Sequence, residues 1–590
     1  MGALEFYLIV LLVYFGTNLL AVWGLNLQFG VGGVANLAYV VVVAAGAYTY
    51  AVLTLGPPAA SGGFQHYVLG LRLPFPVALA SAGLAGGVTG VLIGVTGLKR
   101  LRQDYQAMVM LVVSLMAGTV VAADTGLFNG NAGLSLIPNP ISGVSGMTSG
   151  WPYVGIVAAC CLIGFVVLRR FTTGPMGRAL RAVRDDETAA AAIGKDVVRL
   201  RLVVQAAGGV FAGLSGALLV AFIGGWSPAA WAPVETLALL TAVIVGGMGS
   251  DAGATVGTLV VTVLLLQGVQ FLPEIRSHPG LKEALGWMTL GAVTIAFIWV
   301  RPQGIVPERR PRHGREAPPT HVGRIEPLPP PASRPGAGGE AILEVERLVR
   351  RFGGVAAVDG ASFTVRRGSI TGLIGPNGAG KSTALSVISG FLEPGGGAVR
   401  FDGADVTGRP AHELARRGLV RTFQLAREFR GLTTLENLLV AAPGQRGEGA
   451  PGVLAGRRYW GGQERELVAR ARGLLAMFGM ADREDEPARN LSGGQKRALE
   501  VMRALMTRPR LLLLDEPMAG LSPRLAERLE EVLLQLQRQG LSVLLVEHEL
   551  DVVDRLCEQV VVMAQGRVIS TGRMAELRTR REVQDAYVLG

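Results

Sequence analysis

Two patterns of hydrophobic and polar positions divide the chain. From Leu4 to Val300, long apolar runs follow one another, each close to the about 20 residues that a helix needs to cross a bilayer. From Ala341 onward the apolar runs are short and β-branched and are separated by longer amphipathic stretches. The pattern therefore predicts an all-α polytopic membrane domain followed by an α/β domain.

The apolar runs predict up to nine membrane spans. Segment 236–249 is short for a full span, so a re-entrant hairpin with 253–272 and a total of seven spans is the alternative. The predicted spans cover residues 4–27, 33–55, 75–98, 105–123, 151–168, 203–224, 236–249, 253–272 and 285–300.

Lys and Arg are concentrated in two of the loops between these spans. Loops 99–104 and 169–202 hold eleven basic residues, whereas the loops of the opposite side hold Arg72, Arg276 and Lys282. Because basic loops are retained on the cytoplasmic side, we expect the N-terminus outside and the C-terminal domain in the cytoplasm. No basic residue precedes the first span, so we expect it to be retained rather than cleaved as a signal peptide.

A proline-rich stretch separates the two patterns. Nine of the 34 residues from Pro307 to Glu340 are proline, a composition that favours extended, solvated chain. The sequence therefore predicts a transmembrane domain over 1–303, a linker over 304–340 and an α/β domain over 341–590.

Composition narrows the class of function. The formal net charge of +11 indicates an anionic partner such as lipid headgroups, nucleotide or nucleic acid, and charge alone does not choose among the three. The three cysteines, Cys160, Cys161 and Cys557, allow neither a disulfide framework nor a CxxC metal site. None of the predicted spans carries an ionisable residue near its centre, so we expect transport energy to come from outside the membrane domain.

The predicted spans are rich in Gly and Ala. Small residues let helices pack closely in lipid, and this is the simplest account of them. The alternative is a translocation path that kinks and slides, with Gly30, Gly32, Gly33 and Asn36 near a break between the first two spans.

The strongest local motif is a glycine-rich loop between a strand-like run, Ile370–Ile374, and a helix-like run, Ala384–Phe391. Backbone N–H groups of such a loop converge on phosphate oxygens, with the positive end of a helix behind them. We expect Lys381 to neutralise the β and γ oxygens and Ser382 to offer its hydroxyl to Mg²⁺. The loop consists of Gly375, Pro376, Asn377, Gly378, Ala379, Gly380, Lys381, Ser382 and Thr383.

Two further motifs favour phosphoryl chemistry. The apolar run 511–514 ends in Asp515 and Glu516, where α/β sheets place catalytic groups, so we expect Asp515 to hold Mg²⁺ and Glu516 to polarise the attacking water. A second glycine-rich loop opens a predicted helix and forms a second phosphate cradle. Its residues after Leu491 are Ser492, Gly493, Gly494 and Gln495.

Two phosphate cradles in one domain resemble the ATP-binding cassette, whose ATPases dimerise head to tail so that Leu-Ser-Gly-Gly-Gln of one subunit closes on the γ-phosphate held by the other. The resemblance implies ATP and Mg²⁺ as ligands and a P-loop α/β fold for the C-terminal domain. It assigns Gln424 to the Q-loop near Mg²⁺, His548 to the γ-phosphate contact and Phe352 to stacking on adenine. Residues 519–523 are similar to the D-loop that crosses the dimer.

Details resemble one branch of that family, the branched-chain amino-acid importers. Arg-Thr-Phe-Gln, Ala-Gly-Leu-Ser-Pro, Glu-His-Glu and the C-terminal Asp-Ala-Tyr-Val-Leu-Gly are similar to its ATPase, although Ser522 stands where the family usually has Asn. Residues 99–105 and 177–194 are similar to its permease, and the second stretch is expected to form a coupling helix or, alternatively, an amphipathic helix on anionic headgroups.

The resemblance implies that a permease is fused to its ATPase. We expect ATP-driven import of branched-chain amino acids, or of related small amino acids or amides, across the cytoplasmic (inner) membrane. The expected partners are a second ATPase and permease (self or paralogue), an external solute-binding protein and membrane lipid, but no nucleic acid. The alternatives are an exporter-type half-transporter and a membrane-anchored regulatory ATPase that moves no solute.

Overall fold

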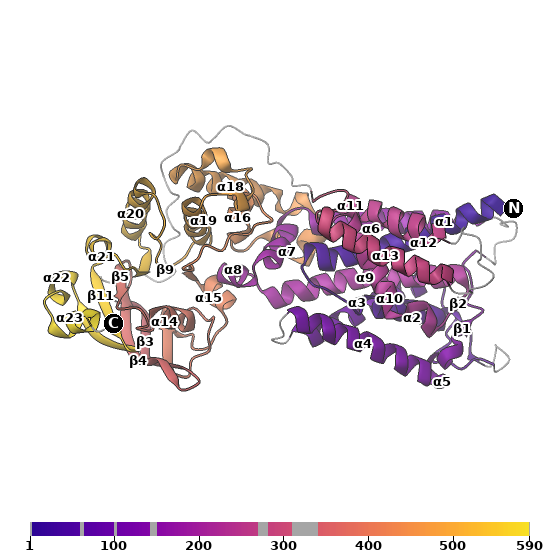
Figure 1. Cartoon of the computed structure of the whole chain (residues 1–590), viewed down its shortest axis with the longest axis horizontal. Helices are drawn as coiled ribbons and strands as arrows, with labels where there is room; N and C mark the ends of the chain where they lie inside the picture. The colour runs from indigo at the N-terminus through magenta and orange to yellow at the C-terminus, as the bar shows by residue number, and fades with distance from the viewer. Residues whose placement is uncertain are drawn as a thin grey trace. The chain divides into compact units, whose positions relative to one another are not determined.

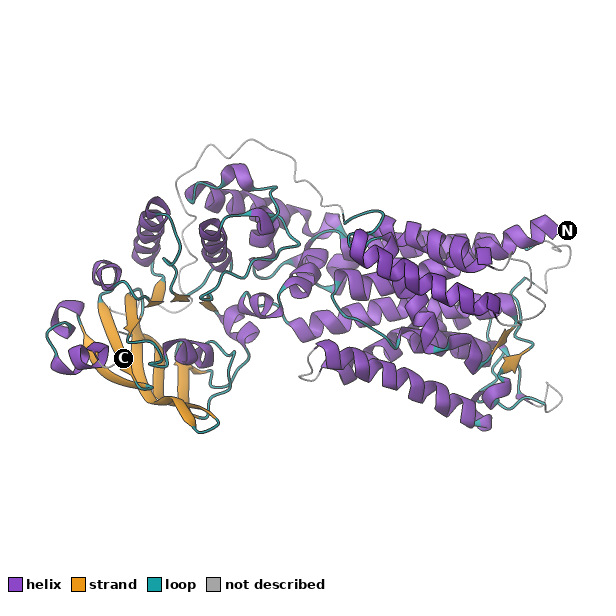
Figure 2. Cartoon of the chain, viewed as in Figure 1, coloured by secondary structure: helices purple, strands orange, loops and turns teal. Residues whose placement is uncertain are grey.

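The computed structural model describes residues 3–58, 64–98, 103–141, 150–269, 281–308 and 340–588. The chain forms two compact units, and the second includes a short piece of the N-terminal half: unit 1 is Met1–Leu180 with Val198–Pro311, and unit 2 is Arg181–Val197 with Arg312–Gly590. Unit 1 is mainly helical, whereas the long strands lie in unit 2 (Figure 2). Lys99, Arg100, Arg102, Arg276 and most of the predicted linker lie outside the described residues.

Unit 1 is built from long apolar helices that run along one another (Figure 1). Its helices are α1 (Ala3–Leu25), α2 (Tyr39–Thr54), α3 (Phe75–Leu98), α4 (Gln103–Ala123), α6 (Trp151–Thr172), α9 (Val197–Ile223), α10 (Pro233–Gly246), α11 (Asp251–Gly257), α12 (Leu266–Val269) and α13 (Leu281–Val300). Two π-helical segments, η1 (Asn26–Val31) and η5 (Thr258–Leu265), continue α1 and join α11 to α12.

The described residues contain seven helices that are long and apolar enough to cross a membrane, and two shorter apolar helices, Tyr39–Thr54 and Ala284–Val300. Pro228–Gly246 has 19 residues and Asp251–Gly268 has 18, so length no longer favours a re-entrant hairpin there. The bounds predicted for loop 169–202 were wrong, because α6 extends to Thr172 and α9 begins at Val197, so the connection between them is shorter. Arg169 and Arg170 lie in the last turn of α6, and Arg199 and Arg201 lie near the start of α9. An Arg side chain at a helix end can extend its charged group away from the apolar span, so the helix continues through these residues.

Glycines let α9 approach its neighbours closely. A Cβ atom at Gly46 of α2 would lie 2.3 Å from the Cα of Gly213, and one at Gly86 of α3 would lie 2.3 Å from the Gly209 carbonyl oxygen. No larger side chain fits at such a distance, so packing of small residues holds α2 and α3 against α9.

The predicted break between the first two helices is present. The π-helical turn η1 ends at Val31, and Gly33 has a φ of 70°, before α2 begins at Tyr39. Buried amides stabilise the break, since Asn36 Nδ2 donates to Gln28 Oε1 at 3.1 Å and to Gln205 Oε1 at 3.3 Å. These contacts satisfy polar groups that lipid could not.

Short elements cover one end of unit 1. Strands β1 (Leu134–Ser135) and β2 (Gly225–Trp226) pair antiparallel, and α5 (Thr125–Phe128) and the 3₁₀ turn η4 (Pro228–Trp231) lie in the same connections (Figure 1).

Unit 2 contains two sheets. A six-stranded sheet has the order β12-β11-β5-β10-β9-β8, parallel except for β12, and a four-stranded antiparallel sheet has the order β4-β3-β6-β7. The strands are β3 (Ala341–Phe352), β4 (Val355–Arg366), β5 (Ile370–Ile374), β6 (Gly396–Phe401), β7 (Ala404–Asp405), β8 (Leu419–Arg421), β9 (Leu511–Asp515), β10 (Ser542–Val546), β11 (Gln559–Ala564) and β12 (Arg567–Gly572).

The central strands β5, β9 and β10 are buried along their whole length, which explains their continuous apolar sequences. The helices of unit 2 are α8 (Glu187–Ala192), α14 (Lys381–Ile388), α15 (Ala411–Arg417), α16 (Thr434–Ala441), α17 (Ala450–Ala455), α18 (Arg457–Met477), α19 (Gly493–Met506), α20 (Pro523–Arg538), α21 (Leu550–Leu556), α22 (Met574–Leu577) and α23 (Arg581–Val588), and α7 (Pro175–Asp185) spans the unit boundary.

Candidate nucleotide-binding site

The predicted site residues follow the carboxyl ends of four neighbouring parallel strands. The glycine loop follows β5, His548 lies after β10, Glu516 follows β9, and Gln424 lies after β8. Because these strands lie side by side and point the same way, segments far apart in sequence meet at one edge of the sheet, where α/β folds bind ligands.

The glycine loop needs its glycines for backbone reasons. Gly375 and Gly380 have φ values of 151° and 97°. A Cβ atom at Gly375 would lie 2.1 Å from the Met563 carbonyl oxygen, and one at Gly380 would lie 2.2 Å from the Ala357 carbonyl oxygen. Gly380 directly precedes α14, which begins at Lys381, three residues earlier than the sequence pattern predicts. The loop therefore presents free N–H groups at a helix N-terminus.

The loop side chains divide into exposed and buried ones. Asn377, Gly378 and Ser382 are exposed, Pro376 and Thr383 are half-buried, and Ala379 is buried. The side chain of Lys381 is buried, and its ammonium donates to the carbonyl oxygens of Gly375 at 2.7 Å and Pro376 at 2.9 Å. Burial lowers the pKa of Lys381, while the carboxylates of Glu516 and Asp515 oppose that shift. A cation is thus held beside the loop.

Asp515 lies at the end of β9 and is only 1% exposed. Its Oδ2 accepts a hydrogen bond from Arg421 Nη2 at 3.0 Å, while its Oδ1 has no hydrogen-bond partner among the described residues. Among those residues no three His, Cys, Asp or Glu side chains gather as a metal site. The free carboxylate oxygen of Asp515 and the exposed hydroxyl of Ser382 are nevertheless oxygen ligands of the kind that fit Mg²⁺, which takes few protein ligands beside phosphate oxygens and water.

Two of the predicted site residues contact the carboxylate of Glu516. Gln424 Nε2 donates to Glu516 Oε2 at 3.1 Å, and His548 Nε2 lies 2.8 Å from Glu516 Oε1. Glu516 itself has a φ of 50°, a conformation that is costly for a non-glycine residue and often marks functional positions. The side chain of His548 is 46% exposed and that of Glu516 16%. The carboxylate therefore lies between a buried sheet and an accessible surface.

Arg497 is a site residue that the sequence interpretation missed. Its guanidinium donates to the backbone carbonyl oxygens of Asp515 at 2.7 Å, of Glu516 and of Phe423, and to Glu500 Oε2 at 3.2 Å. Burial raises the pKa of Glu500, whereas the neighbouring cations oppose that shift. A buried Arg needs several acceptors for its N–H groups. The only sign of this role in the sequence was the position of Arg497 on α19, two residues after Gln495 of the second glycine motif.

The second glycine motif caps its own helix. Ser492 is the N-cap of α19, where its Oγ accepts from Gln495 N at 3.3 Å and Gln495 Oε1 accepts from Ser492 N at 2.9 Å. Ser492 and Gly493 are exposed and Gly494 is half-buried. Within this chain, therefore, the two polar side chains of the motif satisfy the helix end, and its backbone faces outward.

Phe352 lies at the end of β3 in the four-stranded sheet and is 47% exposed. The guanidinium of Arg350 lies 5.0 Å from the centre of its ring. A ring that is partly exposed can stack on a planar ligand, whereas a buried core Phe could not.

A short piece of the N-terminal half belongs to unit 2 by its contacts. Asp186 caps α8 through Ala189 N at 2.8 Å, and its Oδ2 accepts from Arg427 Nη1 at 3.1 Å. The carboxylate of Asp185 accepts from the backbone N–H of Gly431, and Lys195 Nζ lies 2.5 Å from Glu448 Oε1. The stretch predicted as one helix is therefore α7 and α8, separated at Asp186, and α8 packs beside α15.

These contacts lie close to the Q-loop. The Arg427 guanidinium lies 5.0 Å from the centre of the Phe423 ring, and Phe423 directly precedes Gln424. A continuous series of contacts thus runs from Asp186 through Arg427 and the Q-loop to Glu516.

Comparison with known proteins covers both halves of the chain. The family model described as "ABC transporter" matches residues 358–519, and the model described as "Branched-chain amino acid transport system / permease component" matches residues 7–298. A probable branched-chain amino acid transport ATP-binding protein LivG of Archaeoglobus fulgidus is 40% identical over 247 residues, which are 42% of this chain and 95% of that protein. The chain belongs to the ABC transporter family.

Further similarities concern the cassette of this ABC transporter chain. The high-affinity branched-chain amino acid transport ATP-binding protein BraF of Pseudomonas aeruginosa is 38% identical over 248 residues, which are 42% of this chain and 97% of that protein. A crystal structure of a nucleotide-free ATP-binding cassette from an ABC transporter is 37% identical, covers 42% of this chain and 98% of its own, and has a TM-score of 0.37.

The matches confirm the predicted fold class, the family and the enzyme class. The chain is a multi-pass membrane protein with a permease domain and an ABC ATPase in one polypeptide, and it binds ATP. The permease match over residues 7–298 does not favour the exporter-type half-transporter or the regulatory ATPase without transport.

Proposed function

We propose that this chain imports branched-chain amino acids, or related small amino acids or amides, across the cytoplasmic membrane as a fused permease–ATPase subunit. The permease match and the LivG and BraF similarities support that substrate class. The basic residues near the ends of α6 and α9 support a cytoplasmic ATPase and an N-terminus outside. The domain limits follow as 1–303 for the permease, 304–340 for the linker and 341–590 for the ATPase.

The chemistry that we propose for ATP follows from the site residues. The backbone N–H groups of the loop 375–383, in which Pro376 alone has none, would hold the phosphates. Lys381 would neutralise the β and γ oxygens, and Phe352 would stack on adenine. Glu516 would polarise the attacking water. His548 and Gln424, which contact the Glu516 carboxylate, would orient that carboxylate beside the γ-phosphate. Mg²⁺, when bound, would neutralise charge on the phosphates, and its protein ligands would be Ser382, Asp515 and Gln424.

The complete site needs a second cassette. The backbone of Ser492 and Gly493 faces outward in this chain, as a loop does that closes on a nucleotide held elsewhere. We therefore propose pairing with a second ATPase and permease, either a second copy or a paralogue, and delivery of the solute by an external binding protein. ATP binding would bring the cassettes together, and hydrolysis would reset them.

The observation that carries this proposal is the series of contacts from Asp186 to Glu516. A segment that lies within the permease match contacts Arg427, and the Q-loop beside it contacts the carboxylate proposed for hydrolysis. We propose that closure of the ATP site is transmitted through these contacts to the segment around Asp186. This supports transport rather than hydrolysis alone.

Uptake in cells that lack the native copy tests the proposal. We expect the intact chain, with its partners, to restore uptake of labelled leucine but not of labelled urea. We expect Glu516→Gln to bind ATP but to slow hydrolysis at least about a hundredfold and to stop uptake, because one catalytic group is removed. Restored uptake by Glu516→Gln, or failure of the intact chain to restore uptake of either leucine or urea, would contradict the proposal.

A further inference from the structure

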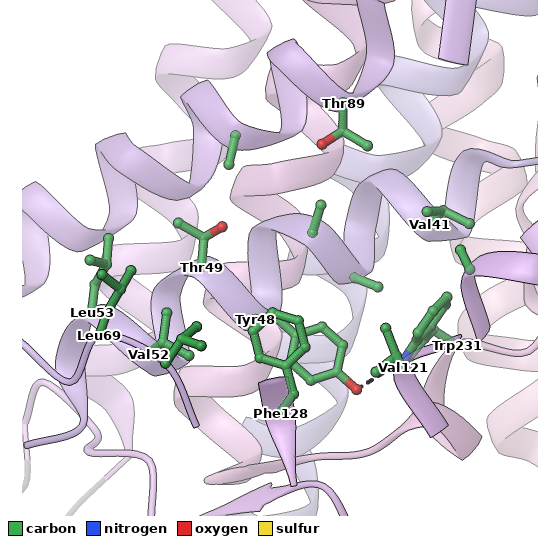
Figure 3. A pocket seen from close by; sticks show the side chains of 15 residues that line it. Val41, Tyr48, Thr49, Val52, Leu53, Leu69, Thr89, Val121, Phe128 and Trp231 are labelled. Atoms are coloured by element: carbon green, nitrogen blue, oxygen red, sulfur yellow. Dashed lines mark hydrogen bonds between the residues drawn. The ribbon is translucent and has the colours of Figure 1, made fainter. Parts of the chain in front are cut away.

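Unit 1 contains a cavity that no step above uses. It has a volume of about 360 Å³ and lies between α2, α3 and α4 (Figure 3). Phe128 of α5 and Trp231 of η4 line it as well, so it reaches the end of unit 1 that carries β1 and β2. In the orientation proposed above, this is the end that faces outside.

The walls of the cavity are apolar. The fifteen described residues that line it include no Asp, Glu, Lys, Arg or His, and ten of them are Ala, Val or Leu. Three aromatic rings form one end: Tyr48 stacks on Phe128 with 4.4 Å between ring centres, and Trp231 Nε1 donates to Tyr48 Oη at 3.3 Å. A charged side chain would lose its water there without compensation, whereas an aliphatic one would gain by burial.

Two hydroxyl groups in this apolar lining have no hydrogen-bond partner in the part of the chain that the structure describes. Thr17, Thr54 and Thr119 donate to the carbonyl oxygen four residues earlier, as hydroxyls in apolar helices usually do. Thr49 of α2 and Thr89 of α3 make no hydrogen bond with any described residue, and both line the cavity. Figure 3 shows their oxygens directed into the space between the two helices.

We propose that this cavity binds the transported solute, an amino acid with an aliphatic side chain, during its passage through the permease. The ammonium and carboxylate groups would bond to the hydroxyls of Thr49 and Thr89, which are only half-buried, so these two charged groups would keep part of their water. The uncharged side chain would lie against Tyr48, Phe128 and Trp231. The inference rests on the proposed import function and adds a site for it. Hydrocarbon alone, such as a lipid acyl chain, leaves both hydroxyls unsatisfied.

Size agrees with this occupant. An engineered apolar cavity of about 150 Å³ holds benzene, and the present cavity, at about 360 Å³, is more than twice as large. It therefore has room for a branched aliphatic side chain with its polar groups, while a bulky addition to one wall would close it.

Binding of labelled leucine to the purified full chain in lipid nanodiscs tests the site without ATP turnover. Ala117 lines the cavity from α4, and Val120 on the same helix is 57% exposed and lies outside the lining. We expect Ala117→Phe to weaken leucine binding about tenfold or more and Val120→Phe to leave it unchanged. We expect the Thr49→Val, Thr89→Val double variant to weaken it about fivefold, because hydroxyls are lost with little change of shape.

Competition identifies the occupant. Unlabelled isoleucine and valine should displace leucine, whereas glutamate should not. Absence of saturable leucine binding at millimolar concentration, equal loss in both Phe variants, or displacement by added fatty acid but not by isoleucine would overturn the proposal. If leucine binds as expected but uptake fails in cells, the import function is wrong and the site remains. If uptake succeeds and both Phe variants transport leucine equally, the site is wrong and the function remains.

Discussion

Asp186 makes two contacts that can be removed separately, a helix cap and an ion pair. Their removal tests how the segment that carries α8 is held at Arg427. Its carboxylate caps α8 through Ala189 N at 2.8 Å and pairs with Arg427 at 3.1 Å. Asp186→Ala removes both contacts. Asp186→Asn keeps the cap, because Asn is as good an N-cap as Asp, and removes only the charge.

The magnitudes follow from exposure. Loss of an N-cap costs about 1 kcal/mol. The ion pair is partly exposed, with Arg427 at 42% and Asp186 at 21%, so it contributes only about 0.2–1 kcal/mol. Asp186→Ala therefore weakens the contact by about 1–2 kcal/mol, a factor of about 5–30, and Asp186→Asn by no more than about fivefold.

The assay is the ratio of ATP hydrolysis with and without loaded binding protein in the reconstituted transporter. We expect the ratio to fall about fivefold or more for Asp186→Ala and clearly less for Asp186→Asn. Asp551→Ala, at a side chain that is 84% exposed, serves as the control and should leave the ratio unchanged. Identical ratios for Asp186→Ala and the control would refute the reasoning, and equal losses for Ala and Asn would show that the charge alone matters.

Three further predictions concern the ATP site. Lys381→Ala should abolish tight ATP binding, because it removes the cation beside the loop, and an unchanged dissociation constant in a nucleotide-binding assay would exclude that role. Arg421→Met should lower the free energy of unfolding by about 3–5 kcal/mol, because it leaves the buried carboxylate of Asp515 unpaired; thermal denaturation of the full chain that matches the unsubstituted protein would contradict this. Gly380→Ala should impair nucleotide binding, since its Cβ would lie 2.2 Å from the Ala357 carbonyl oxygen at a φ of 97°, and normal ATP affinity would show that the loop tolerates the change.

Local patterns in the sequence were enough to predict the two kinds of domain, the glycine loop between β5 and α14, and the break after α1. Each depends on neighbours in the chain: apolar run length, the backbone freedom of glycine, or a strand followed by a helix start. The ends of helices were less predictable, because Arg and Ala continue a helix beyond its apolar core, as α6 and α9 show.

The contacts that give the site its chemistry were decided by tertiary structure. Gln424 and Glu516 are 92 residues apart, and Asp186 and Arg427 are 241 apart, yet each pair is in hydrogen-bond contact. Motif order predicted that Gln424 and Glu516 share a function but not which of their atoms meet, because that depends on the order of strands in the sheet. The contact of Asp186 with Arg427 was not predicted at all. The cavity beside Thr49 and Thr89 likewise exists only where α2, α3 and α4 come together, and nothing in the sequence of any single helix predicts it.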